Sequence, residues 1–282
     1  MTNNDSPNLV IIGNIAYDII DFSKIKPDSN PLIDIGGACV FSTIPASLFY
    51  RVGMVGKIGN DFDMSKFLGY NIDLSGIKQM DQPTTKFYTI WNTIDGQDRE
   101  VMGEVSEEMT VGFRDIPEKF LKAKHFHLTT AEPSNQLEII EFIRQNTNAT
   151  ISVDTIDDFA KKTICRKVFD NVDIAFIDKE YSNLLNCKAN TKIIKYGKKG
   201  CLYWSNKKSF PIYSQVVEDV VDKTGAGDCL NGIFLNLIVN GVNEEKALRI
   251  AVDVATESIK HKGIFDLKNY LNLKNGNNIE SR

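Results

Sequence analysis

The feature that most constrains the fold is a series of short apolar runs, each followed by a glycine or a polar residue. The first run, Leu9–Ile12, is unbroken and ends at Gly13. A run of this length is typical of a strand buried on both faces of a sheet. Comparable runs end near Gly53, Thr129, Asp154, Asp178 and Lys195, and they alternate with helical segments. We therefore predict an α/β fold of three layers, with a mainly parallel central sheet and helices on both faces.

The size and charge of the chain narrow the class of protein. Its 282 residues, of which 42% are hydrophobic, can build a sizeable core, and we expect a single domain over residues 1–282. A net charge of -4 gives no support for binding to nucleic acid or to an anionic membrane. No apolar stretch reaches the roughly 20 residues that a membrane span needs.

The cysteines indicate the cellular compartment. They are odd in number and scattered, and they form no Cys-x-x-Cys pair (Cys39, Cys165, Cys187, Cys201 and Cys229). This argues against a disulfide framework or a structural zinc site. The first eight residues are polar and lack the apolar core of a secretion signal. We expect a cytoplasmic protein.

One stretch, Val220–Phe234, combines the features of a phosphate-binding turn. A β-branched run is followed by Gly-Ala-Gly, then by Asp228, and then by apolar residues at helical spacing. We predict a strand, a tight turn and a helix. Glycines let the backbone approach a ligand closely, and the start of a helix attracts phosphate. A carboxylate there can remove a proton from a hydroxyl that attacks the phosphate. The alternative is that Asp228 only caps the helix.

Residues Asp222–Asp228 (Asp-Lys-Thr-Gly-Ala-Gly-Asp) resemble the C-terminal signature of the ribokinase-like (PfkB) carbohydrate kinases, with Lys223 as the less usual residue. The resemblance covers nearly the whole chain, from about residue 9 to 265. It implies that Asp228 is the catalytic base. It also implies that the amides of Gly225, Ala226 and Gly227 form an anion hole for the phosphoryl group that is transferred.

Asp18 lies among apolar residues at the expected end of a buried strand. An unpaired carboxylate there is costly, so Asp18 either caps a turn or meets a polar ligand. Its spacing from Gly13 resembles the first substrate-binding segment of the family, where this Asp grips two hydroxyls of the acceptor. The pair Gly36-Gly37 resembles the family motif at which a lid bends on closing. The resemblance implies that Asp18, Gly36 and Gly37 belong to the acceptor site.

The sequence departs from the ribose-specific pattern at two positions. Phe41 stands where the family frequently has Asn, and Ala16 stands where ribokinase has a sugar-binding Asn. Two hydrogen-bonding groups for ribose are therefore missing. Phe41 and the aromatic residues of the expected lid favour a ring-shaped acceptor, as in the inositol and nucleoside kinases of this family.

Residues 84–111 change in character. β-forming residues are interrupted by Asp95-Gly96, which predicts an antiparallel hairpin. In the family, a small sheet of this kind covers the acceptor and excludes water, which would otherwise compete for the phosphoryl group. The resemblance implies a lid formed by insertions at about 14–36 and 84–111, with Arg99 as a candidate acceptor contact. Because lid strands in this family often pair between subunits, we expect a homodimer.

Two further segments concern the nucleotide and its metal ion. Lys192–Trp204 resembles the family hairpin beside the nucleotide phosphates, with Lys195 where Thr is common. The nucleotide is thereby assigned to Lys195, Gly197, Gly200, Thr224, Gly225 and Gly227. Asp178–Tyr181 stands at the Asn-x-x-Glu motif that organises magnesium through water. Asp178 replaces the Asn, and the Glu is absent unless the register slips by one to Glu180. Either carboxylate can serve a hydrated magnesium ion.

These observations predict a kinase that uses ATP and Mg2+ to phosphorylate an alcohol of a sugar, polyol or nucleoside, with inositol or a nucleoside favoured over ribose. A second hypothesis is a catalytically weak sensor of the same fold that binds nucleotide or sugar, which the altered magnesium motif favours. His125 and His127 share one face of a strand, but a zinc site would need further ligands.

Overall fold

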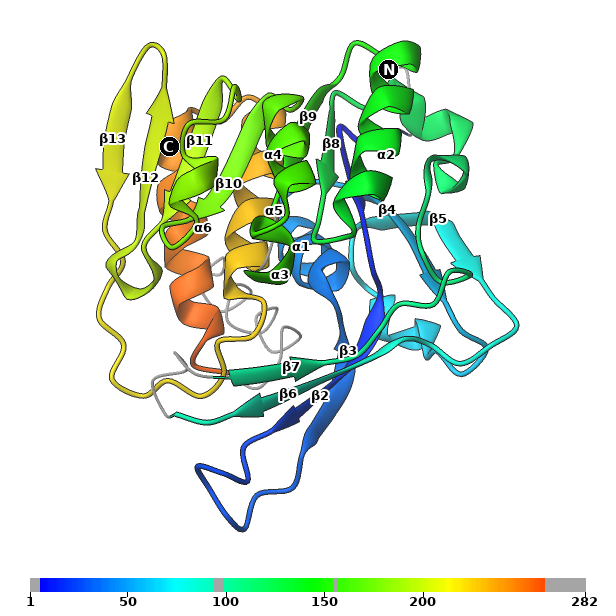
Figure 1. Cartoon of the computed structure of the whole chain (residues 1–282), viewed down its shortest axis with the longest axis vertical. Coiled ribbons are helices and arrows are strands. Elements are labelled where there is room, and N and C mark those ends of the chain that lie inside the picture. The colour runs from blue at the N-terminus through cyan, green and yellow to red at the C-terminus, as the bar shows by residue number, and fades with distance from the viewer. Residues whose placement is uncertain (1–5, 94–98, 155–156, 262–282) are drawn as a thin grey trace.

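The protein is described from a computed structural model, which covers residues 6–93, 99–154 and 157–261. It consists of a large central sheet between two layers of helices, with a small separate sheet at one end (Figure 1). The predicted α/β class and mainly parallel sheet are confirmed. None of the helices in the described ranges has the length and apolar content that crossing a bilayer requires.

The central sheet has nine strands in the order β13-β12-β11-β10-β9-β8-β1-β4-β5. Neighbouring strands from β5 to β11 are parallel, and β12 and β13 are added antiparallel. The strands are β1 (Leu9–Ile12), β4 (Val52–Ile58), β5 (Ile72–Gln79), β8 (His125–Leu128), β9 (Thr150–Val153), β10 (Ile174–Asp178), β11 (Thr191–Lys195), β12 (Cys201–Ser205) and β13 (Ser209–Ile212).

Because the side chains of each central strand alternate between the two faces of the sheet, the sheet has two apolar faces, and a layer of helices covers each. In β1, Leu9 and Ile11 face one core, whereas Val10 and Ile12 face the other, because successive side chains of a strand point to opposite faces. The first core is covered by α1 (Ala38–Ala46), α5 (Ala226–Val239) and α6 (Glu244–Ser258). The second is covered by α2 (Pro133–Asn146) and α4 (Thr163–Asp170), and the short α3 (Asp157–Ala160) packs against α4.

Five short 3-10 helices complete the described elements. They are η1 (Met64–Phe67), η2 (Phe113–Asp115), η3 (Glu118–Lys122), η4 (Ser182–Leu184) and η5 (Gly197–Lys199).

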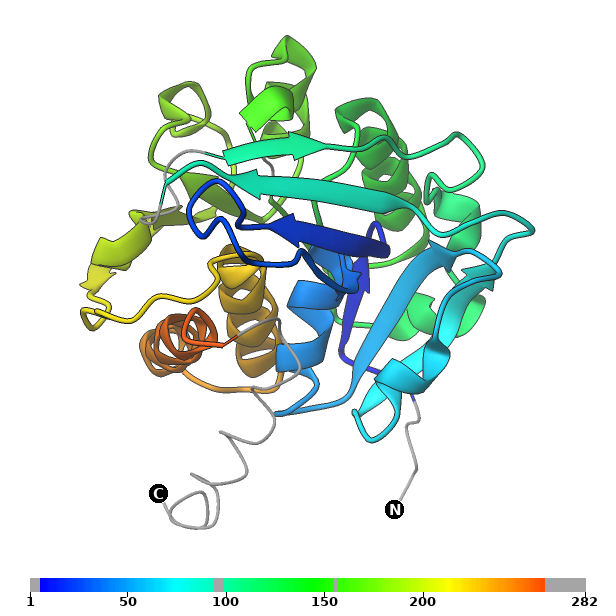
Figure 2. The same ribbon diagram turned by 90° about the horizontal axis from the view of Figure 1, so that it is seen from below.

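The small sheet has four strands in the order β3-β2-β6-β7. They are β2 (Ala16–Asp21), β3 (Leu32–Gly36), β6 (Lys86–Trp91) and β7 (Arg99–Met102). The predicted hairpin is present as the antiparallel pair β6–β7, although its Asp95-Gly96 turn lies outside the described residues. Seen from below, the small sheet runs across the end of the central sheet (Figure 2). Its strands fall within the segments 14–36 and 84–111, and its action as a lid stays a prediction.

One local expectation was wrong. Val220 and Val221 were predicted to form a strand, but they have no strand conformation. Instead, the amides of Val221 and Asp222 both donate to the carbonyl of Ile259, just beyond the end of α6 (2.8 and 3.1 Å). The β-branched run has no neighbouring strand to pair with, so its backbone is satisfied by a helix end.

Candidate active site

The start of α5 lies beside the carboxyl end of β11. Gly225 precedes the helix with a φ of 72°, a left-handed conformation that favours glycine, and Asp228 lies in the first helical turn. A Cβ atom added to Gly227 would lie only 3.3 Å from Nζ of Lys195, the last residue of β11. Because the first N–H groups of a helix have no intrahelical acceptor, the segment Gly225–Gly227 can receive an anion.

One of the three predicted amides is already engaged. The amide of Ala226 donates to the carbonyl of Lys223 at 3.2 Å. An anion that binds to this amide must replace or share that turn hydrogen bond. The predicted anion hole of three amide donors would therefore form fully only when a bound anion takes over the amide of Ala226.

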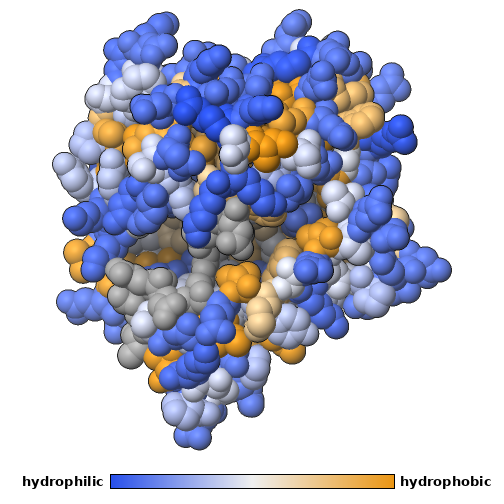
Figure 3. All heavy atoms as spheres, in the orientation of Figure 1, coloured by the Kyte–Doolittle hydropathy of each residue, from blue (hydrophilic) through white to orange (hydrophobic). Residues whose placement is uncertain are grey.

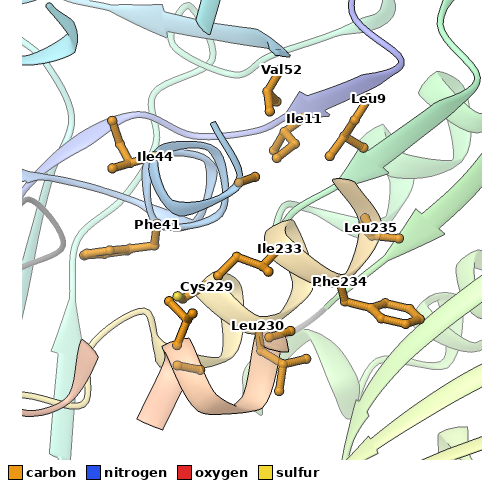
Figure 4. Packing of buried hydrophobic residues seen from close by; sticks show 14 of the residues in the cluster. Leu9, Ile11, Phe41, Ile44, Val52, Cys229, Leu230, Ile233, Phe234 and Leu235 are labelled. Carbon is orange, nitrogen blue, oxygen red and sulfur yellow. The ribbon is translucent and has the colours of Figure 1, made fainter. Parts of the chain in front are cut away.

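Phe41 fixes the turn from the side of α1. Its ring lies where a Cβ of Gly225 would be, and the side chain is only 5% exposed. Figure 4 shows Phe41 and Ile44 on α1 in the same apolar cluster as Cys229 and Ile233 on α5. Phe41 therefore shapes the turn Gly225–Gly227 through packing, and its role as a direct substrate contact stays a prediction; because this turn is the predicted phosphate site, we call it the phosphate turn.

Asp18 lies in the middle of β2 and is 8% exposed. Its Oδ2 accepts a long hydrogen bond (3.4 Å) from the amide of Gly37, whereas its Oδ1 is buried without a hydrogen-bond partner among the described residues. Burial raises the pKa of this carboxyl to about 6, against the lowering effect of the Gly37 amide. A Cβ on Gly36 would overlap the carboxylate, so Asp18, Gly36 and Gly37 do lie together. An unpaired buried acceptor is suited to a ligand hydroxyl.

Asp222 connects Asp18 to the phosphate turn. Its Oδ1 accepts a hydrogen bond from the amide of Thr224 (2.9 Å), and its charge adds to the raised pKa of Asp18. The hydroxyl of Thr224 is buried and has no hydrogen-bond partner within the described ranges. A cavity of about 50 Å³ lies where Val220–Lys223 meets the small sheet at Trp91. The small sheet and the segment that leads into the turn thus line one open cavity.

The starts of α1 and α5 also lie close together. Cys39, in the first turn of α1, has its pKa raised to about 12 by burial, and the negative charge of Asp228 adds to this shift. Gly37 lies on the side of the site that is predicted to bind the acceptor, and Asp228 is the candidate base. These two residues therefore lie at the starts of two neighbouring helices, α1 and α5.

This arrangement can be compared with known proteins. Residues 6–267 match the family described as pfkB family carbohydrate kinase. The chain belongs to this family. It is a phosphotransferase that acts on an alcohol group, within the sugar and nucleoside kinases of the pfkB family.

Relatives and solved structures agree with this assignment. The chain is 26% identical to the cytidine kinase of Thermococcus kodakarensis, over 91% of this chain and 97% of the relative. It is 25% identical to the ribokinase of Bacillus subtilis, over 89% of this chain and 92% of the relative. The structure of a putative ribokinase II of E. coli in complex with ATP and Mg2+ has the same fold, with a TM-score of 0.75, 19% identity, and coverage of 95% of this chain and 99% of that chain.

The predicted nucleotide hairpin of this pfkB kinase is β11–η5–β12. Gly197 and Gly200 have φ values of 57° and 95°, so both need glycine-like conformations at the turn. A Cβ on Gly200 would overlap the carbonyl of Ile212 in β13. The hairpin brings Lys195 to Gly227, and the role of Gly197 and Gly200 as nucleotide ligands stays a prediction.

The two candidate metal residues lie in different surroundings. The Asp178 side chain is 37% exposed and lies 3.3 Å from Nζ of Lys195, next to the phosphate turn. Glu180 is 62% exposed and ion-pairs with Lys179 at 3.5 Å. No cluster of three or more His, Cys, Asp or Glu side chains suited to a metal ion is present in the described ranges. Magnesium in a phosphate site usually keeps several waters and needs one or two carboxylates, so Asp178 fits a hydrated ion.

Arg99 and the pair of His125 and His127 lie on strands, the first in the small sheet and the other two in the central sheet. Arg99 begins β7 opposite Trp91, and its side chain lies outside the part of the chain that the structure describes. His125 and His127 are fully buried, and both contact the Ser152 hydroxyl at 2.8 Å. Burial lowers the pKa of each imidazole to about 3, so both are neutral polar groups of the core.

The sequence reasoning missed Asn231 as a site residue. It lies three residues after Asp228, is fully buried, and donates to Oδ2 of Asp154 at 2.6 Å. The available signal was an amide side chain among the apolar residues of α5, since a buried amide needs a polar partner. Asp154 lies 77 residues away in the chain, so that partner could not be read locally.

Proposed function

We propose that this kinase transfers the γ-phosphoryl group of ATP to a hydroxyl of a small polyhydroxylated acceptor, and that the preferred acceptor is a nucleoside. The observation that carries the proposal is the meeting of two helix starts. Asp18 and Gly37 stand beside α1, and Gly225–Asp228 opens α5. An acceptor held at Asp18 and a phosphoryl group held at the turn would be adjacent.

In this proposal Asp228 accepts the proton of the acceptor hydroxyl. The freed oxygen forms a bond to the γ-phosphorus, the bond from that phosphorus to the bridging oxygen breaks, and ADP leaves. Because the charge develops on the phosphoryl oxygens, the amides of Gly225–Gly227 stabilise the transition state more than the ground state. A positioned base of this type contributes about 10²- to 10⁴-fold in rate.

The donor and the metal ion are part of the same proposal. ATP is favoured because a solved structure of the same fold is a complex with ATP and Mg2+. Lys195, Gly197, Gly200 and Thr224 are the chain's candidates to hold the nucleotide. Magnesium, when bound, neutralises charge on the phosphates, and Asp178 is the residue that we propose holds it through water.

The residues around Asp18 restrict the class of acceptor that the site can bind. One relative is named for a nucleoside and the other for ribose, so the names alone do not decide. Ala16, two residues before Asp18, is fully buried and offers no hydrogen bond to a sugar. The ring of Phe41 packs on Gly225 and so gives no direct argument for a ring-shaped acceptor. Ala16 therefore counts against ribose-type recognition, and we rest the preference for a nucleoside on the match to cytidine kinase, which covers 97% of that relative, with inositol as the competing acceptor.

We also propose that two copies associate through the small sheet. Ile33, Ile19, Tyr88 and Met102 are direct neighbours in register across its four strands. Ile33 is 64% exposed, Met102 is 50% exposed and Tyr88 is 43% exposed. An aligned apolar row on one face of a sheet is suited to an identical row from a second copy.

The cytoplasm is the compartment that we propose for this reaction. All five cysteines are buried as free thiols, which is typical of a reducing compartment. The face shown in Figure 3 is mostly hydrophilic, with apolar side chains in separate small groups.

The test is a screen of ATP consumption with magnesium against nucleosides, inositol, hexoses and ribose, followed by identification of the phosphorylated product. We expect turnover with a nucleoside. The Asp228→Asn variant is the control for contaminating kinases. Nucleotide binding without turnover of any acceptor would instead support the sensor hypothesis, and efficient turnover of ribose would remove the acceptor assignment.

A further inference from the structure

The ammonium of Lys195 is buried beneath the phosphate turn. Its side chain is only 10% exposed, and it comes from the end of β11 in the central sheet. Nζ lies 2.8 Å from Oδ2 of Asp154 and 3.3 Å from Oδ2 of Asp178. An ammonium has three N–H donors, of which the hydrogen bond to Asp154 uses one, while Asp178 is an ion-pair partner.

The ammonium lies close to the backbone of Gly227. A Cβ on Gly227 would lie 3.3 Å from Nζ and 4.0 Å from Cδ of Lys195, a tight contact that the end of the lysine side chain would have to relieve by shifting. The absence of a side chain at Gly227 thus lets the cation lie close to the backbone that begins α5. A phosphoryl group bound at the turn would therefore be next to a lysine donor.

Two carboxylates, of Asp154 and Asp178, lie within ion-pair distance of the ammonium of Lys195, at 2.8 and 3.3 Å. Without this cation, the two negative charges would be left uncompensated near the turn that is proposed to receive a triphosphate. Their repulsion would oppose binding, because charges interact strongly at partly buried sites.

Asp154 is itself held in place from two directions. Its Oδ2 accepts hydrogen bonds from Lys195 and from Nδ2 of Asn231, at 2.8 and 2.6 Å. Asn231 belongs to the same helix as the phosphate turn, one turn after Asp228. The cluster thus ties β9, β11 and α5 together and fixes the ammonium relative to the turn.

We propose that Lys195, a candidate to hold the nucleotide, specifically donates an N–H to an oxygen of the terminal phosphoryl group, and that Asp154 and Asn231 are the residues that position its ammonium. This inference rests on the proposed function and adds a preorganised cation to the backbone amides of the turn. Lysine at this position serves as a point charge toward phosphate.

The test compares two variants whose buried charges differ. Lys195→Met removes the cation but leaves Asp154 and Asp178 uncompensated, so we expect a lower thermal midpoint as well as loss of function. The double variant Lys195→Met/Asp154→Asn removes one charge of each sign, and we expect it to regain thermal stability. We expect kcat to fall about 10²-fold or more in both variants, as for loss of one preorganised donor. Lys192→Met is the matched control, because Lys192 comes from the same strand but stacks on the Trp204 ring.

A binding readout separates this inference from the proposed function. Calorimetry with ATP, ADP and AMP, each with magnesium and without acceptor, is expected to show at least a tenfold loss of ATP affinity in the double variant and little change for AMP. This result does not depend on knowing the acceptor. If the double variant regains both stability and wild-type ATP affinity, Lys195 is only a structural partner of Asp154 and the inference is overturned.

Discussion

The ring of Phe41 occupies the space that a side chain at position 225 would need, so α1 and the phosphate turn are in direct contact through one residue pair. This contact joins the acceptor side of the site, which begins at Gly37, to the side that receives phosphate. Glycine is favoured at position 225 for two reasons: a side chain would overlap the Phe41 ring, and the φ of 72° is a left-handed conformation.

The first prediction concerns this contact. Gly225→Ala is expected to lower the free energy of unfolding by more than the roughly 1–3 kcal/mol typical of a left-handed non-glycine residue, because the new methyl group also meets the Phe41 ring. Gly197→Ala is the matched control: Gly197 has a φ of 57°, but a Cβ there meets no atom within 4 Å. Urea denaturation measures both variants. Equal destabilisation of the two would contradict a packing role for Phe41.

The second prediction concerns the proposed base. Asp228→Asn is expected to keep the fold and ATP affinity while kcat falls by about 10²- to 10⁴-fold, because the amide cannot accept the hydroxyl proton. Asp253→Asn, an exposed substitution on α6, serves as control. Initial rates and nucleotide titration provide the measurements. Near-normal turnover in Asp228→Asn would remove the mechanism.

The third prediction uses the buried Asp18 carboxyl. Its pKa is raised from 3.8 to about 6, so the folded state binds this proton more tightly than the unfolded state. Stability from Asp18 is therefore greatest below about pH 4, and about 3 kcal/mol is lost as the pH rises through 6. The nearby charges of Asp222 and Asp34 act in the same direction, and the Gly37 amide opposes them.

The measurement for Asp18 is urea unfolding at pH 4.5 and pH 7.5. Asp18→Asn is expected to gain stability relative to wild type at pH 7.5 and to differ less at pH 4.5, while acceptor binding weakens. Asp21→Asn, on the same strand, is the control with the opposite sign, since hydrogen bonds from Ser23 lower the pKa of Asp21. A constant difference at both pH values would show that Asp18 is not buried in ionised form.

The fourth prediction concerns the small sheet. Wild-type protein is expected to sediment as a dimer, and Tyr88→Glu or Met102→Lys is expected to produce monomers, because a charge would be buried in the apolar row. Leu68→Lys is the control, since Leu68 is 77% exposed but lies outside the small sheet. Sedimentation velocity at several concentrations gives the answer. A monomeric wild type would rule out this interface.

The sequence predicted the fold wherever local pattern determined structure. Apolar runs marked the central strands, and the spacing after Asp228 marked α5. It did not reveal that the amides of Val221 and Asp222 bond to Ile259 just beyond α6, because a β-branched run looks the same with or without a neighbouring strand. Nor did it reveal the grouping of Lys195, Asp154 and Asn231, because these side chains meet only after β9, β11 and α5 are assembled.

The residues of the candidate active site were also predictable only where they belong to a local motif. The glycines and Asp228 carry a local motif, and Asp18 stood out as an acid among apolar residues. Phe41 could not be placed, since a buried ring on a turn and a ring facing a substrate have the same local sequence. The edge strand β5 was missed because Asp73, Ser75 and Lys78 interrupt its apolar pattern, and its partner on the central sheet is β4 alone.

Four chain segments join the small sheet to the rest of the protein, and all of them meet it at the same end of its strands: before β2, after β3, before β6 and after β7. Ala16 and Gly36 are register partners there, and Asp18 lies two residues further along β2. A point near a pivot moves through a short arc while the far tip moves through a long one. Rotation of the small sheet would therefore shift its outer loops by many times the displacement of Asp18. Under the proposed function, an acceptor bound at that carboxylate would therefore move little while the outer loops of the small sheet moved far.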